Sequence, residues 1–434
     1  MKKENAYIPR LFDKVLAFAL QSKGAVIVEG PKWCGKSTTS ARHAKAIIDL
    51  MPLSTRQQYI DFAKMAPHEF LADEKHPLLI DEWQHVYFIW DQIKWEVDQS
   101  HEFGQFILTG SVTDKSIMDE ATETGESKHT GNGRIVRKRM RPMSLFESGD
   151  GDGGVSLSGI MKGVFQPCRS AKSVKDYAFY ICRGGWPLSL CENREVALQQ
   201  AIDFYEVLCS DDIFSIKTIP LRKDEEKARQ LVRSYARNVS IAASDRTLIE
   251  DCMGGSNSFD EATFAKYMLA LKYLYVVEEL PAWNPNLRSK TAIRTKPTRH
   301  FVDPSIGAAA LGVSPEGLFR DVTTFGLLFE SLAIRDLRVY GDYLGARLYK
   351  YRDSKNREAD AVMQFKDGSW ALFEMKLGDS EDIEDGAKKM LDIAKDIDVQ
   401  KTGKPAFLMV VTKGPLAYRR PDGVYVAPLS CLRP

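Results

Sequence analysis

Short apolar runs alternate with longer polar segments along the first third of the chain. The runs "GAVIVEG" (24–30), "HPLLIDEW" (76–83) and "GQFILTGS" (104–111) are bounded by glycine, proline or charged residues. Uninterrupted apolar runs of this length are typical of strands buried in a parallel sheet. The segment "KSTTSARHAKAIIDL" (36–50) has helix composition and directly follows the first run. We therefore expect an α/β domain at the start of the chain.

The pattern changes after residue 150. Residues 151–175 are rich in Gly and Ser, and we expect a connection or an insertion there. A long helical stretch (195–216) and three further helical segments follow, at 225–240, 244–253 and 258–280. The next segment (280–304) resembles two strands around a turn and holds five basic residues within twelve: Arg288, Lys290, Arg294, Lys296 and Arg299. Three helices before a basic hairpin are the element order of a winged helix, which either contacts DNA or packs between domains.

Composition limits the class of protein. A chain of 434 residues is too long for one ordinary core, so we expect two or three domains. The formal net charge of +1 means that any basic surface for nucleic acid must be local. Seven cysteines without a CxxC pair argue against zinc and against a disulfide framework. The amphipathic start of the chain and the lack of a long apolar run favour a cytoplasmic protein with no membrane partner.

The eight residues from Gly30 to Ser37 match the phosphate-binding pattern G-x-x-x-x-G-K-[ST]. The glycines let backbone N–H groups surround a phosphate, Lys36 would reach the β- and γ-phosphates, and the Ser37 hydroxyl would hold Mg²⁺. The alternative, a chance glycine-rich turn, is disfavoured because a strand precedes the loop and a helix follows it. We therefore predict ATP and Mg²⁺ as cofactors. The predicted nucleotide-binding residues are Gly30, Pro31, Lys32, Trp33, Cys34, Gly35, Lys36, Ser37 and Thr38.

A second strand, from Pro77 to Ile80, runs into two acids. Asp81 would contact the magnesium ion through its water shell. Glu82 is placed to polarise an attacking water, which favours hydrolysis over nucleotide storage; the alternative is an exposed acid at a strand end. A third strand ends near Thr109 and Ser111, which either sense the γ-phosphate or form a turn.

A basic segment follows, in which alternation over "RIVRKRMRPMSL" (134–145) predicts an edge strand. An arginine here could complete the charge around the transferred phosphate, in its own site or in that of a neighbouring copy. Arg134 is the predicted residue. The alternative is a solvated basic edge that blocks aggregation.

A second set of chemical residues lies near the C-terminus. Asp360 opens one strand of "READAVMQFKDGSWALFEMKLG" (357–378), and Glu374 and Lys376 lie on the return strand. Alternate residues of a strand share a face, so Glu374 and Lys376 point the same way. Two carboxylates and a lysine could bind a divalent ion and activate water for phosphodiester cleavage. An upstream helix contributes Glu330.

Several motifs together resemble a known family. "YIPR", "GAVIVEGPKWCGKST", "LLIDEWQ", "FILTGS", "GRIVRKRMRPMSLFES", "RGGWPLSL" and "HFVDPSIGAAALG" resemble the AAA-type ATP-binding proteins of prokaryotes that carry a DUF4143 domain. The resemblance implies an ASCE-type ATPase fold, a winged helix and a nuclease-like C-terminal domain. That domain is similar to the PD-(D/E)xK nuclease superfamily: Glu330 matches its helix acid, Asp360 its first strand acid, and Glu374 and Lys376 its ExK. Members of the family often lose these residues, so an inert docking fold is the alternative.

We therefore expect an α/β chain with four parts. These are an AAA-like P-loop ATPase domain (1–150), a linker and helical segment (151–222), a winged-helix-like domain (223–305) and a DUF4143-type nuclease-like domain (306–434). The leading hypothesis is an Mg²⁺-dependent ATPase coupled to DNA or RNA, with Glu82, Lys36, Arg134, Glu374 and Lys376 as catalytic residues and Ser37, Asp81, Glu330, Asp360 and Glu374 as metal ligands. The alternative is a nucleotide-switched regulatory or scaffold protein that binds a protein partner.

Overall fold

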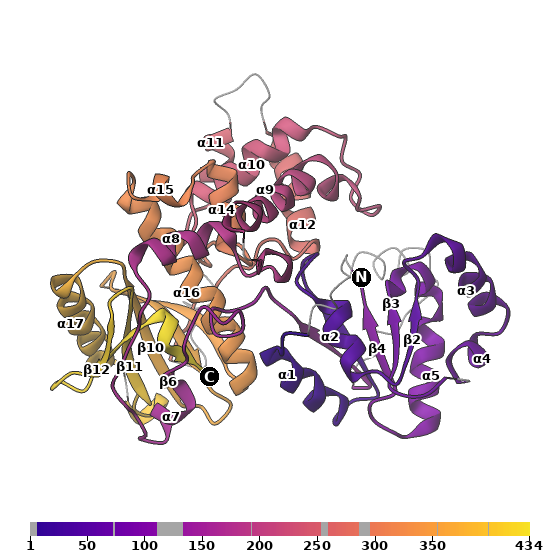
Figure 1. Ribbon diagram of the computed structural model, residues 1–434, viewed down its shortest axis with the longest axis horizontal. Coiled ribbons are helices and arrows are strands. Elements are labelled where there is room, and N and C mark those ends of the chain that lie inside the picture. Colours follow the sequence, from indigo (N-terminus) through magenta and orange to yellow (C-terminus); the bar gives the residue numbers. More distant parts are fainter. Residues whose placement is uncertain are drawn as a thin grey trace. The chain divides into compact units, whose positions relative to one another are not determined.

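The computed structural model describes residues 7–72, 74–110, 133–191, 193–252, 259–285, 296–353, 355–397 and 399–434 (Figure 1). The chain divides into two compact units. The N-terminal unit consists of Met1–Arg141, Asp211–Lys223 and Met268–Val276. The C-terminal unit consists of Pro142–Ser210, Asp224–Tyr267 and Val277–Pro434.

The N-terminal unit is built on a parallel sheet of five strands in the order β2-β3-β4-β1-β5 (Figure 1). The strands are β1 (Ala25–Glu29), β2 (Ala46–Asp49), β3 (Leu78–Asp81), β4 (Phe106–Thr109) and β5 (Ile135–Arg139). Three of them match the predicted apolar runs, and β5 is the predicted basic edge strand. This confirms the α/β class for the first part of the chain.

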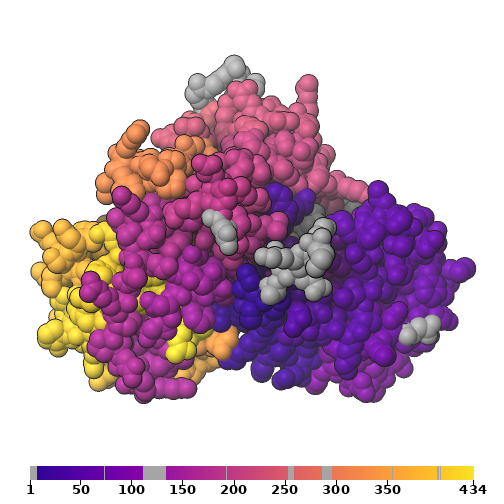
Figure 2. Space-filling model, in the orientation of Figure 1, coloured from indigo at the N-terminus to yellow at the C-terminus, as the bar shows by residue number. Residues whose placement is uncertain are grey.

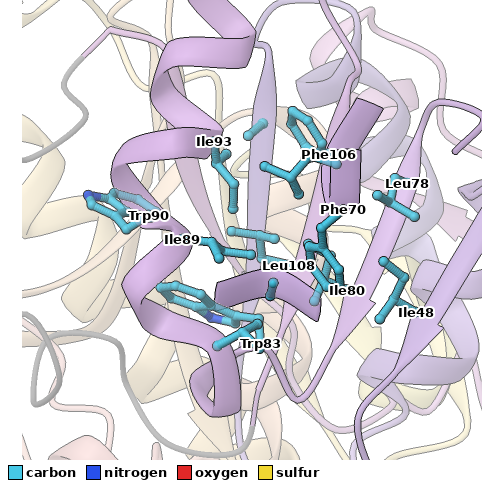
Figure 3. Packing of buried hydrophobic residues seen from close by; sticks show 14 of the residues in the cluster. Ile48, Phe70, Leu78, Ile80, Trp83, Ile89, Trp90, Ile93, Phe106 and Leu108 are labelled. Carbon is cyan, nitrogen blue, oxygen red and sulfur yellow. The ribbon is translucent and has the colours of Figure 1, made fainter. Parts of the chain in front are cut away.

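The helices of the N-terminal unit lie before, between and after these strands along the chain. They are α1 (Leu11–Leu20), α2 (Lys36–His43), α3 (Leu53–Met65), α4 (Pro67–Ala72), the 3₁₀ helix η1 (Trp83–Ile89) and α5 (Trp90–Ser100), with η3 (Asp212–Phe214) later in the chain. Figure 3 shows Trp83, Trp90 and Ile93 in one buried cluster with the strand residues Ile80 and Leu108, so the aromatic segment after β3 covers the sheet.

The prediction of one continuous helix over residues 36–50 is wrong. Helix α2 ends at His43, and the apolar residues that follow it form β2. Ile48 is buried opposite Ile80 of β3. Burial against a neighbouring strand therefore decides the structure of this short apolar segment over the helix composition that precedes it.

The C-terminal unit contains a helical part and a mixed sheet. The helices are α7 (Leu157–Met161), α8 (Val174–Arg183), η2 (Pro187–Ser189), α9 (Arg194–Ser210), α10 (Glu225–Arg237), α11 (Asp245–Cys252), α12 (Glu261–Tyr273, which extends into the N-terminal unit), α14 (Pro304–Leu311), α15 (Pro315–Leu318), α16 (Val322–Leu344), α17 (Ser380–Asp396), α18 (Val399–Thr402) and η4 (Leu429–Cys431). The strands are β6 (Val155–Ser156), β7 (Cys168–Arg169), β8 (Arg347–Arg352), β9 (Glu358–Gln364), β10 (Trp370–Lys376), β11 (Phe407–Thr412), β12 (Leu416–Arg419), β13 (Tyr425–Pro428) and β14 (Leu432–Arg433).

Seven of these strands form one sheet in the order β7-β12-β13-β11-β10-β9-β8. The elements α16, β8, β9, β10, α17 and β11 follow one another in the predicted α-β-β-β-α-β order. The segment predicted as a connection (151–175) also supplies short strands: β7 pairs with β12, and β6 pairs with β14. In Figure 2 this magenta segment lies against the yellow C-terminal strands.

A buried ion pair holds three of the sequence motifs together in the C-terminal unit. Arg335 of α16 is 1% exposed and donates hydrogen bonds to Asp303 (2.9 Å) and to Asp336 (2.7 and 2.9 Å). Asp336 also accepts from the Leu145 N–H, and Asp303 accepts from the Gly185 N–H, both at 3.0 Å. The segments "RPMSLFES", "RGGWPLSL" and "HFVDPSIG" therefore meet at one arginine, which gives these motifs a structural role.

Candidate functional site

The glycine-rich loop lies between the end of β1 and the start of α2. Its backbone has positive φ at Gly30 (152°), Trp33 (65°) and Gly35 (98°). A Cβ atom added at Gly30 would lie 2.1 Å from the Met140 carbonyl oxygen, so the loop requires glycine there. The loop ends at the N-terminus of an eight-residue helix, where free backbone N–H groups favour an anion.

The predicted phosphate-binding lysine is held over this loop. Lys36 is 8% exposed, and its ammonium donates hydrogen bonds to the carbonyl oxygens of Gly30 (2.9 Å) and Pro31 (2.8 Å). The side chain of Cys34 is buried and directed at the Met140 carbonyl, while Ser37 and Thr38 are exposed. The Lys36 ammonium is therefore held by uncharged carbonyl oxygens and has no carboxylate as its partner in these two hydrogen bonds.

The structure brings together the two predicted magnesium ligands of this site. The Ser37 hydroxyl donates a 2.9 Å hydrogen bond to Asp81 Oδ1. Thr109 lies opposite Asp81 in the β3–β4 register, and its hydroxyl donates to the same carboxylate. An alcohol oxygen and a carboxylate side by side are hard oxygen ligands, so these residues fit Mg²⁺. Ser111, the other predicted γ-phosphate sensor, lies outside the described residues.

Glu82 follows Asp81 in the left-handed region, with φ 57°. Its carboxylate accepts a hydrogen bond from the Gln84 side-chain amide, a partner that the sequence reasoning missed. The backbone turn therefore directs Glu82 away from the line of β3, and Gln84 restrains the orientation of its carboxylate. Such an oriented carboxylate can accept a proton from water.

Two other contacts to the loop were also missed. Arg10 is 6% exposed, and its guanidinium donates to the carbonyl oxygens of Cys34 (2.8 Å) and Arg141 (2.7 Å). Lys32 forms a 2.6 Å ion pair with Asp212 in η3. The "YIPR" segment carries no local pattern that predicts the Arg10 contacts, and no local pattern connects Asp212 to the loop.

Arg134 is not placed to act at its own loop. It precedes β5, whose first residue pairs with Ala25, whereas the loop follows the other end of β1 at Glu29. The Arg134 side chain forms an ion pair with Asp98 of α5. The prediction for its own site is therefore not supported, because the side chain lies at the opposite end of the strand. Action at a neighbouring copy stays a prediction.

The C-terminal acids converge, but a lysine lies among them. Lys350 Nζ is 3.7 Å from Glu330 Oε1, 3.5 Å from Glu358 Oε2 and 3.6 Å from Asp360 Oδ1. We call this group, together with the residues that contact Glu374, the carboxylate–lysine cluster. Its members are Glu330, Lys350, Glu358, Asp360, Glu374, Lys376 and Lys389.

Glu374 is paired within this cluster. It is 1% exposed, Lys376 Nζ lies 3.1 Å from its Oε1 atom, and Lys389 contacts the same oxygen. Burial and the nearby Asp360 raise the pKa of Glu374, while Lys389 opposes the rise. Burial and Asp360 likewise raise the pKa of Glu330 to about 8, against the effect of Lys350.

This arrangement does not fit the predicted metal site. Within the part of the chain that the structure describes, no three His, Cys, Asp or Glu side chains are grouped so as to hold a metal ion. The Lys350 ammonium lies within 4 Å of both Glu330 and Asp360, and its positive charge opposes a divalent cation there. The predicted ligands Glu330, Asp360 and Glu374 are therefore close together but already compensated by lysines.

The predicted winged-helix elements follow one another as expected. Helices α10, α11 and α12 precede two antiparallel bridges, Val277 to Phe301 and Leu280 to Thr298. Of the predicted basic hairpin residues, Arg288, Lys290 and Arg294 lie outside the described residues. Arg299 is 4% exposed and paired with Asp245 and Glu279, so it supports the hairpin from inside. The winged helix and its DNA contact stay predictions.

The parallel sheet, the glycine-rich loop and the paired Ser37 and Asp81 define a P-loop nucleoside triphosphatase domain. Comparison with protein families agrees: an AAA domain matches residues 22–148, and two domains of unknown function, DUF8612 and DUF4143, match residues 174–317 and 325–432. The chain is an AAA-type ATPase with a C-terminal DUF4143 domain.

Comparison with solved structures gave distant likenesses. A Walker-type ATPase of Pyrococcus abyssi is 12% identical, with a TM-score of 0.44 over 71% of this chain and 97% of its own. A Drosophila ORC bound to DNA is also 12% identical, with a TM-score of 0.20 over 71% of this chain and 89% of its own. No curated protein matched the sequence. Among the described helices, none has the length and apolar character needed to cross a bilayer.

Proposed function

We propose that the ATPase reaction depends on Mg²⁺ and uses four residues of the N-terminal unit: Lys36, Ser37, Asp81 and Glu82. The hydrogen bond between Ser37 and Asp81 is the observation that carries this proposal, because it places an alcohol and a carboxylate oxygen beside the loop. Mg²⁺ bound there would neutralise charge on the β- and γ-phosphates.

The remaining roles belong to the chain itself. The Lys36 ammonium binds phosphate oxygens in place of the two loop carbonyls that it now contacts. Glu82 orients the attacking water and accepts its proton, with Gln84 holding the carboxylate. Thr109 keeps the Asp81 carboxylate in place from the neighbouring strand.

The residue assignment is tested with Lys36→Ala and Glu82→Gln. We expect K36A to lose ATP binding, and E82Q to bind ATP but to hydrolyse it at least 100-fold more slowly. Matched controls are Lys64→Ala, whose ammonium lies over the Phe88 ring, and Glu69→Gln in the first turn of α4. ATP hydrolysis by K36A at the rate of K64A would show that the assigned loop is not the site.

We further propose that this ATPase acts on nucleic acid held by the middle of the chain. The support is the order of three helices followed by two antiparallel bridges, together with the basic residues of the segment that the sequence predicts as a hairpin. DNA binding should weaken steeply with salt, and DNA or RNA should stimulate ATP hydrolysis. If neither effect occurs at low salt, the proposal fails and the alternative is favoured, in which the partner is a protein and the nucleotide acts as a switch.

A further inference from the structure

The carboxylate–lysine cluster is arranged around one ammonium group. Lys350 is largely buried and lies 3.5–3.7 Å from oxygens of Glu330, Glu358 and Asp360. Those acids come from α16 and β9, and Glu374 comes from β10. The Lys350 ammonium contacts acids from a helix and from a neighbouring strand. It therefore occupies the position that a metal ion shared by these acids would need.

The backbone fixes Lys350 in this position. The Lys350 N–H donates to the Pro281 carbonyl (2.8 Å), and the Lys350 carbonyl accepts from the Trp283 N–H (2.7 Å). The register between β8 and β9 also shifts at this residue. Tyr349 lies opposite Val362, but Tyr351 lies opposite Ala359. Lys350 therefore lies opposite two residues of β9, one of which is Asp360. This two-against-one pairing is a β-bulge, which changes the direction of the side chains beside it.

The charges of the cluster nearly balance without any added ion. Four carboxyl groups (Glu330, Glu358, Asp360 and Glu374) face three ammonium groups (Lys350, Lys376 and Lys389). A divalent cation would add two charges beside Lys350 at a distance where like charges repel strongly. The two buried oxygens Glu330 Oε1 and Glu374 Oε2 have no hydrogen-bond partner among the described residues, so ligand atoms would be available if the lysine were removed.

We propose that Lys350 is the built-in counter-ion of this centre and that the DUF4143 domain of this chain works without a divalent metal. Phosphodiester cleavage that requires Mg²⁺ or Mn²⁺ at Glu330, Asp360 and Glu374 is then absent. The cluster instead crosslinks α16, β9 and β10 through buried charges. Glu330, Asp360 and Glu374 are not grouped to hold a metal ion while Lys350 lies among them; replacing the lysine by a neutral side chain of similar length lets them close on a divalent cation.

The experiment counts Mn²⁺ ions bound to the full chain without nucleotide, by electron paramagnetic resonance. All proteins carry Asp81→Asn, which removes a ligand from the site in the N-terminal unit. We compare D81N, D81N/K350M, D81N/K350R and D81N/K350M/E374Q, and we add D81N/E374Q as a control that keeps Lys350. We expect D81N/K350M to bind one Mn²⁺ ion, and D81N, D81N/K350R and D81N/K350M/E374Q to bind none. Binding by D81N/K350M should be at least 10-fold tighter than by D81N/K350R, because arginine keeps the positive charge.

Two results would overturn the proposal. One is a Mn²⁺ ion bound to D81N that is lost in D81N/E374Q, or DNA nicking by D81N that Mn²⁺ supports and E374Q abolishes. The other is a folded D81N/K350M chain that binds no Mn²⁺. If K350M does not fold, D81N and D81N/E374Q decide alone: equal counts and no nicking support the proposal, and a difference refutes it.

Discussion

The clearest functional prediction concerns Arg10, which supports the phosphate-binding loop from outside. Its guanidinium donates one hydrogen bond to the Cys34 carbonyl within the loop and another to the Arg141 carbonyl after β5. Arg10→Met keeps the length and apolar stem of the side chain but removes both bonds. We expect the loop to lose its fixed geometry while the sheet beneath it stays folded.

The size of the effect follows from these two contacts. A hydrogen bond from a charged donor contributes about 1.5–3 kcal/mol. Only the bond to Cys34 holds the loop itself, so the loop conformation that binds phosphate becomes less favourable by about that amount. Since about 1.4 kcal/mol corresponds to a factor of ten, ATP should bind about 10- to 100-fold more weakly. The bond to Arg141 affects mainly the stability of the unit.

The assay is a titration with Mg²⁺ and ATP followed by calorimetry. Arg56→Met is the matched control, because Arg56 also donates to two backbone carbonyls, those of Leu50 (2.6 Å) and Met51 (2.5 Å), but in a different loop. We expect R56M to bind ATP with a Kd within about threefold of that of the wild-type chain, since the hydrogen bonds that it loses lie outside the phosphate-binding loop. A folded R10M chain with the wild-type Kd would refute the reasoning.

Three further predictions concern the loop, the buried ion pair and the acidic cluster. Gly30→Ala would place a Cβ atom 2.1 Å from the Met140 oxygen, so ATP binding should fall more than about 100-fold in the same titration; wild-type affinity would contradict the loop geometry. Arg335→Met leaves two buried acids without their partner and should lower the unfolding free energy, measured in urea, by about 3–5 kcal/mol. The control Arg352→Met, at an exposed ion pair, should lower it by about 1 kcal/mol or less. Equal losses in the two variants would contradict the structural role of Arg335. The Glu330 pKa of about 8 lies above its ordinary value of 4.5, so the folded chain keeps a proton that the unfolded chain releases. Its contribution to the unfolding free energy should therefore fall as pH rises from about 4.5 to 8, by up to about 1.4 kcal/mol per pH unit, and Glu330→Gln should flatten the profile; an unchanged slope would show that another group titrates.

The N-terminal site was predictable because its requirements are local. The loop needs glycine where φ is positive and a β-carbon would collide, as at Gly30, and it needs the lysine at the start of a helix. These demands fall within eight consecutive residues, so the sequence displays them directly. The pairing of Ser37 with Asp81 also followed, because parallel strands of one sheet end at the same edge, and only β4 separates β1, which leads to Ser37, from β3, which ends at Asp81.

The parts that sequence reasoning missed depend on contacts between distant residues. Arg10 meets Arg141 across 131 positions, and Lys32 meets Asp212 across 180. No periodicity encodes such pairs, since each depends on how separate segments pack. The strand β2 was missed for a related reason: four residues are too few to show a strand period, and only pairing with β3 buries Ile48.

The two sites differ most in what their lysines contact, and this difference decides what each site can bind. Lys36 bonds two neutral carbonyl oxygens, so a negatively charged phosphate offers it a stronger partner and can replace them. Lys350 contacts three carboxylates, so a divalent cation would have to displace a charge already well compensated. The sequence pattern around Glu374 is nevertheless complete, with Glu330, Asp360 and Lys376 all present. A sequence motif therefore shows which coordinating atoms are present. The charges that the fold places beside those atoms determine whether they still need to bind an ion.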